Sequence, residues 1–191
     1  MRRIYLFIDT ETTGLGKNAM PYEIGITATN EDGMILADFN ENINTNYQKF
    51  EKAAWTMFKK YHSNKELKSW QDGNEVINKL VAFLNQFEDD EIVVICHNAD
   101  YDLQIIKNLL NSHKRLWDVF KSKRGGGYLN FSWLCSMFTL RTLKALGKWD
   151  KGCRLDDVRE HMGIEDRAHT ALADTRVTKR LWFEIVKPII G

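Results

Sequence analysis

Residues 7–15 read FIDTETTGL, and this stretch joins the end of an apolar run to two closely spaced acidic side chains. Side chains of an extended chain alternate between its two faces, so Asp9 and Glu11 point to the same side. Two neighbouring carboxylates repel each other, and the pair alone contributes nothing favourable to folding. The pattern therefore predicts that a cation lies between these two side chains.

Length and composition indicate an ordinary globular protein. The chain has 191 residues, of which 43% are hydrophobic and 28% charged, and its 27 Lys and Arg residues nearly balance its 26 Asp and Glu residues. This composition differs from that of disordered and membrane-spanning proteins. Because the charges balance, a function in coating long nucleic-acid duplexes is disfavoured, whereas a local basic patch is compatible with this composition. We expect residues 1–191 to form one domain.

Targeting and redox features indicate a soluble protein of the cytoplasm. The first apolar run, IYLFI, is interrupted by Asp9 and is too short for a signal peptide or a membrane span. The three cysteines, Cys96, Cys135 and Cys153, are an odd number at scattered spacings, which is typical of reduced thiols. We therefore expect a cytoplasmic protein without a membrane partner.

Hydrophobic patterning predicts strands first and helices later. Short apolar or alternating runs indicate four strands, the middle two joined by the turn NEDG, at residues 4–8, 23–29, 34–40 and 92–96. Apolar residues at helical spacing indicate helices at residues 75–87, 102–110, 132–146, 154–162 and 169–186. This order predicts an α/β fold in which helices cover a mixed sheet.

Two segments lack a clear pattern. Residues 41–74 combine aromatic side chains with many lysines, and we expect short helices and loop there. The favoured interpretation of these aromatics is a small separate core, and the alternative is stacking on single-stranded nucleic acid. Residues 121–127, KSKRGGG, predict a mobile basic loop that either contacts phosphates or is a solvated hairpin tip.

Two further acidic side chains and one histidine add to this pattern. Asp102 follows the second buried strand, and His169 and Asp174 lie near the start of the last helix. Groups beyond the carboxyl ends of strands meet in one crevice of an α/β sheet. If the last helix packs its first turns over that edge, these side chains share one pocket with Asp9 and Glu11.

Such a pocket would require divalent cations. An oxygen-only ligand set suits Mg²⁺ or Mn²⁺ better than Zn²⁺, and two such ions roughly 3.5–4 Å apart can clamp a phosphodiester. A histidine can then accept the proton of the attacking water. Taken singly, each residue has an ordinary explanation as a strand-end acid, a helix acid or a satisfied histidine. Their joint occurrence favours phosphodiester hydrolysis with two divalent ions.

Three ordered segments, DTETTGL, HNADYD and HTALAD, resemble the Exo I, II and III motifs of the DnaQ-like 3′–5′ exonucleases, which have a ribonuclease H-like fold. A histidine five residues before the last aspartate is typical of the DEDDh branch of this family. The segments LCSMFTLRTL and RLDDVREHMGI also resemble the family, so the resemblance covers most of the chain. It implies a mixed sheet of five strands with flanking helices.

The resemblance also implies a role for each matching residue. Asp9 would bridge both metal ions, Glu11 and Asp174 would complete the site of the water-activating ion, Asp102 would support the second ion, and His169 would be the general base. The 3′-terminal nucleotide would meet the backbone amides of Thr12 and Thr13 and the side chain of Leu15, although ordinary packing explains Leu15 equally well. His97 and Asn98 are interpreted as structural residues whose side chains satisfy backbone groups.

The expected substrate is the 3′ end of single-stranded DNA or a frayed 3′ end. An exoribonuclease that trims RNA 3′ ends is the alternative within the same class, because the metal site serves both sugars. A non-catalytic, proofreading-like module on a polymerase-type partner is disfavoured by the complete acidic set, and a phosphohydrolase of free nucleotides by the three ordered motifs. Homodimers are common in the family, but no segment of this chain declares an interface.

Overall fold

Five strands form one mixed sheet in the order β3-β2-β1-β4-β5. The computed structural model describes residues 2–45, 50–116, 119, 133–165 and 169–190. The strands are β1 (Arg3–Thr12), β2 (Pro21–Thr29), β3 (Ile35–Asn42), β4 (Glu91–Cys96) and β5 (Trp133–Cys135). The first three pair antiparallel, whereas β4 runs parallel to β1 and β5 parallel to β4. The predicted mixed five-stranded sheet is confirmed.

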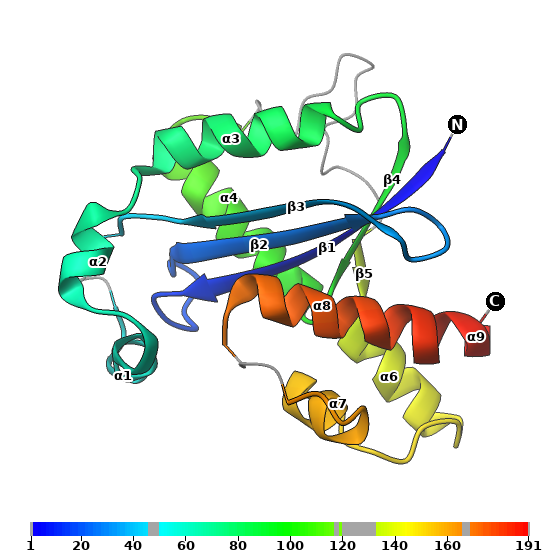
Figure 1. The fold of residues 1–191 in the computed structure, drawn as a ribbon. Coiled ribbons are helices and arrows are strands. Elements are labelled where there is room, and N and C mark those ends of the chain that lie inside the picture. The colour runs from blue at the N-terminus through cyan, green and yellow to red at the C-terminus, as the bar shows by residue number, and fades with distance from the viewer. Residues whose placement is uncertain (1, 46–49, 117–118, 120–132, 166–168, 191) are drawn as a thin grey trace.

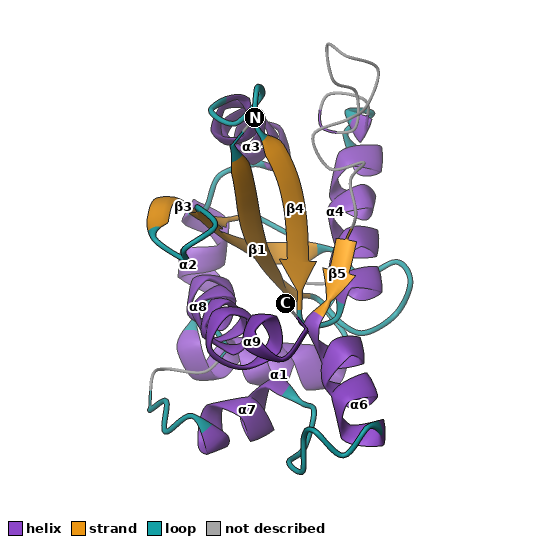
Figure 2. Cartoon of the chain, turned by 90° about the vertical axis from the view of Figure 1, so that its right-hand side faces the viewer, coloured by secondary structure: helices purple, strands orange, loops and turns teal. Residues whose placement is uncertain are grey.

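Helices cover both faces of this sheet (Figures 1 and 2). They are α1 (Lys52–Tyr61), α2 (Asn64–Ser69), α3 (Gly73–Asn85), α4 (Ala99–Ser112), α6 (Ser136–Ala145), α7 (Leu155–His161) and α8 (Ala171–Leu181). Helix α8 continues through a π-helical segment (Trp182–Val186) into α9 (Lys187–Ile190). One hydrophobic core lies between the sheet and α3 and α4, and a second lies between the sheet and α6, α7 and α8.

Strand β1 lies at the centre of the sheet and contributes to both cores. Its even-numbered apolar side chains pack with α3 and α4, while Tyr5 and Phe7 pack with α6 and α8. Burial on both faces explains why the run IYLFI is continuously apolar. Asp9 and Glu11 continue the odd-numbered set, so the strand period places both carboxylates on the face that α8 covers.

The expectation that residues 132–146 are helical throughout is wrong at its start. Residues Trp133–Cys135 form β5, which pairs with the last three residues of β4 at the edge of the sheet. A strand of three residues is too short to show a periodic pattern, and pairing with β4 determines its conformation. Helix α6 begins directly after it. The predicted basic loop at 121–127 lies outside the described residues.

The segment 41–74 contains two short helices with a small core of their own, which confirms the favoured interpretation of its aromatics. Phe58 and Leu67 are buried there against Tyr22 of β2, and Phe50, Trp55 and Trp70 pack around them. A capping box between Ser63 and Glu66 begins α2. Within the described residues, no helix is both long and apolar enough to cross a membrane.

Candidate active site

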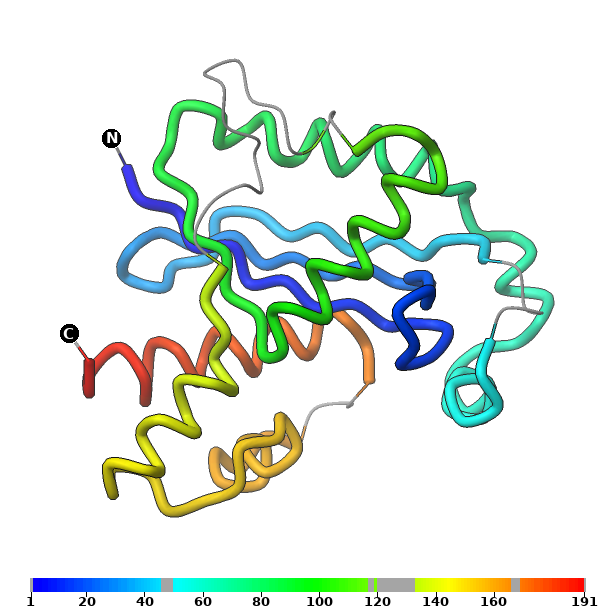
Figure 3. The backbone as a smooth tube through the Cα atoms, turned by 180° about the vertical axis from the view of Figure 1, so that it is seen from behind, coloured from blue at the N-terminus to red at the C-terminus, as the bar shows by residue number. Residues whose placement is uncertain are grey.

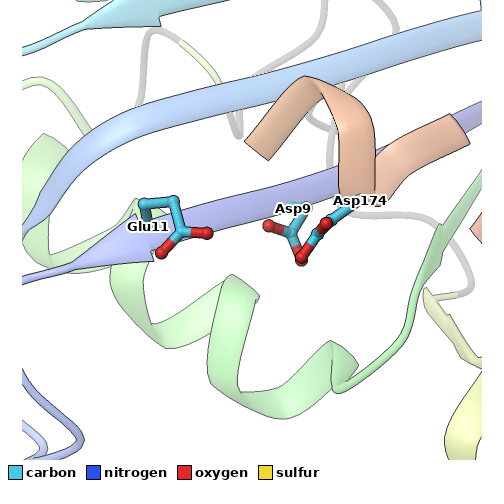
Figure 4. Close-up of side chains that lie close together, drawn as sticks. All are labelled: Asp9, Glu11 and Asp174. Atoms are coloured by element: carbon cyan, nitrogen blue, oxygen red, sulfur yellow. The ribbon is translucent and has the colours of Figure 1, made fainter. Parts of the chain in front are cut away.

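Three carboxylates converge at the carboxyl end of β1. Asp9 and Glu11 come from β1 and Asp174 from the first turn of α8, and each offers an oxygen within 4.8 Å of the others (Figure 4). Helix α8 reaches this position because β2 carries Gly25 beneath it. A Cβ atom on Gly25 would lie 2.4 Å from the backbone carbonyl carbon of Ala171. The absence of a side chain at this position therefore lets α8 approach the sheet.

Asp102 lies next to this triad, in the first turn of α4. Its side chain is buried, and Oδ1 accepts a hydrogen bond of 2.9 Å from the hydroxyl of Thr10. Its charge is one of the neighbours that raise the pKa of Asp9. The structure thus brings Asp102 close to Asp9 without including it among the three converging oxygens, and its role as a metal ligand stays a prediction.

The carboxylates form an electrostatically unfavourable group in the absence of a cation. Burial, reinforced by neighbouring carboxylates, raises the pKa of Asp9 well above its ordinary value and that of Glu11 to about 8. Burial likewise raises the pKa of Asp102 to about 7, although bonds from Thr10 oppose the rise. Groups that resist ionisation together, and that offer only oxygen donors, fit hard divalent cations.

His169 directly precedes Thr170, the N-cap residue of α8. Its φ angle of 64° lies in the left-handed region, which a residue with a side chain rarely adopts outside functional or tightly constrained positions. The positive form of His169 lowers the pKa of Asp174, so the imidazole lies near that carboxylate. Its ring also contacts Tyr61 of α1, with the ring centroids 6.3 Å apart. These contacts place His169 beside the cluster, and its role as base stays a prediction.

Glu23 of β2 is an acidic residue of the site that sequence reasoning missed. It is 3% exposed, and a backbone N–H of Ala171 at the start of α8 donates to it. Burial raises its pKa to about 7, and its Oε2 has no hydrogen-bond partner within the described part of the chain. A glutamate within a strand that is buried throughout was the available signal. Glu23 fixes the helix that carries Asp174.

Arg159 of α7 was also missed. Its side chain is buried, and Nη2 donates to Oδ1 of Asp174. Burial raises the pKa of Asp174, and the charges of Arg159 and His169 oppose that rise. Nε and Nη1 of Arg159 have no partner among the described residues. The polar sequence RLDDVREHM gives no signal that this arginine, rather than its neighbours, faces inward.

The loop after β1 is tied down from two sides. Tyr101 of α4 donates to the carbonyl of Gly14, and its hydroxyl also lies 2.6 Å from that of Thr12. Glu51, next to α1, accepts from the backbone N–H of Gly16 over 3.0 Å. Leu15 at the tip is 84% exposed. A rigid loop thus presents Leu15 to solvent, and contacts of Thr12 and Leu15 with a nucleotide stay predictions.

Thr13 differs from these two residues because its polar groups are already used inside the loop. It is buried, its backbone N–H donates to the carbonyl of Met20, and its hydroxyl accepts from the N–H of Met20. A nucleotide could reach this amide only if the loop opened. The predicted contact of Thr13 with substrate stays untested.

His97 has the contacts of a structural residue. Its Nδ1 lies 3.0 Å from the Ser136 hydroxyl and its Nε2 3.0 Å from the carbonyl of Cys153, and burial lowers its pKa to about 4. It therefore links the end of β4 to α6 and to the segment before α7. Asn98 occupies the N-cap position of α4, but its side chain makes no capping bond there. That the Asn98 side chain satisfies backbone groups stays a prediction.

Solved structures of exonuclease I share this fold. A product-bound exonuclease I superposes with a TM-score of 0.77 at 13% identity, covering 98% of this chain and 44% of that one. Escherichia coli exonuclease I in complex with a dT13 oligonucleotide gives 0.73 at 15% identity, covering 98% and 42%. The chain thus spans less than half the length of these proteins. At such identities the similarity establishes the ribonuclease H-like fold alone.

Comparison with protein families gives a more specific result. No curated protein matches the chain. The family model of the 3′–5′ exoribonuclease Rv2179c-like domain matches residues 4–186. This match includes the three converging carboxylates, Asp102 and His169. Because it covers nearly the whole sequence, the chain belongs to the Rv2179c-like 3′–5′ exoribonuclease domain family, and with it to the DnaQ-like 3′–5′ exonucleases.

Proposed function

We propose that the protein is a divalent-metal-dependent 3′–5′ exoribonuclease that removes nucleotides from the 3′ end of single-stranded RNA. The observation that carries this proposal is the convergence of Asp9, Glu11 and Asp174 within 4.8 Å, with Asp102 buried beside them. The family description supports RNA, the alternative substrate, over single-stranded DNA, which the sequence alone favours.

The carboxylates fit two Mg²⁺ or Mn²⁺ ions, because they offer only oxygen donors and because burial, reinforced by neighbouring carboxylates, raises the pKa values of Asp9, Glu11 and Asp102 when no cation is present. Asp9, Glu11 and Asp174 would hold the ions together with Asp102. When bound, the ions supply positive charge to the scissile phosphate and lower the pKa of a water molecule.

His169 is the candidate general base of the reaction. Its position one residue before the N-cap of α8 keeps the imidazole close to the acidic cluster. It would accept the proton of the water that attacks the phosphorus, and the Asp174 carboxylate nearby would stabilise the resulting imidazolium. Arg159 and Glu23 would act as positioning residues, since they hold Asp174 and the start of α8.

Single-stranded DNA is the second candidate substrate, and one observation favours it. Escherichia coli exonuclease I, which shares the fold, has been solved with dT13 and with dA16 oligonucleotides. The same carboxylate cluster can hydrolyse either polymer, because the discriminating contact is with the 2′-hydroxyl and not with the phosphate.

A matched-substrate assay tests the proposal. RNA and DNA of the same sequence, labelled at the 5′ end, are incubated with the protein in Mg²⁺, in Mn²⁺ and in EDTA, with the Asp9→Asn variant as a control. We expect the RNA to shorten stepwise from its 3′ end, only when metal is present and only with the unaltered protein. Faster shortening of the DNA would overturn the RNA assignment, and an intact RNA under every metal condition would overturn the function.

A further inference from the structure

The segment that contains helices α1 and α2 carries a net positive charge. Residues 51–70 contain five lysines against two glutamates, an excess of three positive charges, whereas the whole chain has a net charge of only +1. Both glutamates are engaged: Glu51 accepts from Gly16, and Glu66 closes the capping box with Ser63. The five lysines are all exposed, and together we call them the basic ridge: Lys52, Lys59, Lys60, Lys65 and Lys68.

The packing of this segment explains why its lysines face outward. Its aromatic side chains Trp55, Phe58 and Trp70 pack in the small core, where Trp55 stacks on Phe58 with ring centroids 5.1 Å apart. The side chain of Lys59 lies over the Trp55 ring, with Nζ 5.7 Å from the ring centroid. These aromatic residues thus pack inward, and the five lysines are exposed on the outer side.

The segment that carries the basic ridge, together with the small core beneath it, adjoins the active site at three points. Tyr61, at the end of α1, contacts the ring of His169. Glu51 holds the loop after β1, and Tyr22, which belongs to the same small core, lies 3.4 Å from Oε2 of Glu11 through its hydroxyl. Figures 1 and 3 show α1 and α2 beyond the carboxyl end of β1, where the carboxylates converge.

The opposite side of the site has the opposite charge. Helix α7 lies on the other side of the start of α8 from α1 (Figures 1 and 3). Asp156, Glu160 and Glu165 are exposed on α7 and the turn after it. Arg154 is an exposed cation at the N-cap of α7, whereas Arg159 is buried against Asp174. A polyanion is therefore repelled along α7 and attracted along α1 and α2.

We propose that the basic ridge binds the phosphates of the RNA strand upstream of the nucleotide being removed, so that the strand leaves the site over α1 and α2. This inference rests on the proposed function, because it presupposes a 3′ end at the carboxylates. The ridge contacts phosphates only, so it holds the strand without regard to base sequence and makes binding dependent on strand length and salt.

Two triple variants test the ridge. The ridge variant combines Lys59→Ala, Lys60→Ala and Lys65→Ala. The control variant combines Lys144→Ala, Lys148→Ala and Lys151→Ala, three exposed lysines at and after the end of α6. Both variants lose the same charge. Binding of a 12-nucleotide RNA is measured at several salt concentrations, in Asp9→Asn protein so that the RNA stays intact, and kcat/KM is measured on the 12-mer and on a dinucleotide.

We expect the ridge variant to bind the 12-mer about tenfold more weakly at low salt, with a log–log salt slope shallower by about 0.7 for each phosphate that the lysines no longer neutralise. The ratio of kcat/KM on the 12-mer to that on the dinucleotide should fall about fivefold. The control variant should change both quantities less than twofold. Thermal unfolding of both variants checks that the fold is intact.

Of the three other outcomes, the first two contradict the ridge and the third contradicts the proposed function. If both triple variants weaken RNA binding equally, the net charge of the protein, and not the basic ridge, determines the affinity. If the ridge variant lowers activity on the 12-mer and the dinucleotide by the same factor, the lysines support the site and do not bind the upstream strand. If wild-type protein cleaves neither RNA but the ridge variant alone loses binding, the proposed function fails, and the lysines form an RNA-binding surface that serves no hydrolysis.

Discussion

Nη2 of Arg159 donates a hydrogen bond to Oδ1 of Asp174, and both side chains are largely buried at the junction of α7 and α8. A guanidinium cannot give up its proton inside a protein, whereas a carboxylate can take one up. The two partners therefore respond differently when the other is removed. The pair also brings positive charge to a site that otherwise gathers carboxylates, and this charge keeps Asp174 ionised more readily than burial alone would.

This asymmetry predicts unequal effects on stability. In metal-free protein, Asp174→Ala leaves a buried guanidinium without a counter-charge and should lower the free energy of unfolding by about 3 kcal/mol. Arg159→Met should cost less, because Asp174 can become protonated. Urea unfolding in EDTA measures both. A larger loss for Arg159→Met than for Asp174→Ala would show that the pair is not the main contact of either side chain.

Glu23 should act on catalysis only through the position of α8. Glu23→Ala removes the acceptor for the Ala171 N–H, and we expect it to lower kcat about tenfold, with a stability loss of about 1 kcal/mol. Glu23→Gln keeps an acceptor oxygen and should restore most of kcat. The measurement is kcat on a short RNA for both variants. If Gln is as damaging as Ala, the charge of Glu23 matters and not its bond to the helix.

The sequence was sufficient to predict the central strand and the carboxylates of the site, for physical reasons. A central strand buried on both faces is a continuous apolar run, and the spacing of Asp9 and Glu11 follows directly from the strand period. The last helix shows its start through the motif that contains His169 and Asp174. These signals are local, so one segment at a time reveals them.

The residues that were missed depend on tertiary contacts. Arg159 and Asp174 are 15 residues apart, and only the packing of α7 against α8 makes them partners. Gly25 and Glu23 lie in a strand whose sequence does not show which helix crosses it. β5 exists because the edge of β4 accepts three further residues. Such features arise from pairings between elements, which hydrophobic periodicity does not encode.

In metal-free protein, we expect the free energy of unfolding to decrease as the pH rises. Glu11 has a pKa of about 8 in the folded protein and Asp102 about 7, against ordinary values near 4 in the unfolded chain. The folded state therefore holds more protons, and stability is lost as pH rises through the folded values. In EDTA, the urea concentration at the midpoint of unfolding should decrease as the pH is raised from 6.5 to 8.5. Added Mg²⁺ should restore the higher midpoint.

The pH range starts at 6.5 because, below that value, the titration of His97 changes the stability in the opposite direction. The pKa of His97 is lowered to about 4, so the unfolded chain binds a proton more readily, and stability falls as pH drops from about 6.5 to about 4. Glu11→Gln is the matched control, because it removes one of the raised carboxylates and should flatten the slope above pH 6.5. A midpoint that rises with pH in EDTA would contradict the raised values.

One pair of variants should distinguish the general base from the metal ligands. His169→Gln should lower kcat on RNA by about 10²- to 10⁴-fold, because it removes the proton acceptor but leaves every carboxylate in place. Asp9→Asn should abolish activity by weakening metal binding itself. Thermal unfolding with increasing Mg²⁺ distinguishes the two: the ion should still stabilise His169→Gln, and it should stabilise Asp9→Asn much less. If Mg²⁺ no longer stabilises His169→Gln, the histidine supports the metal site, and its assignment as the base is wrong.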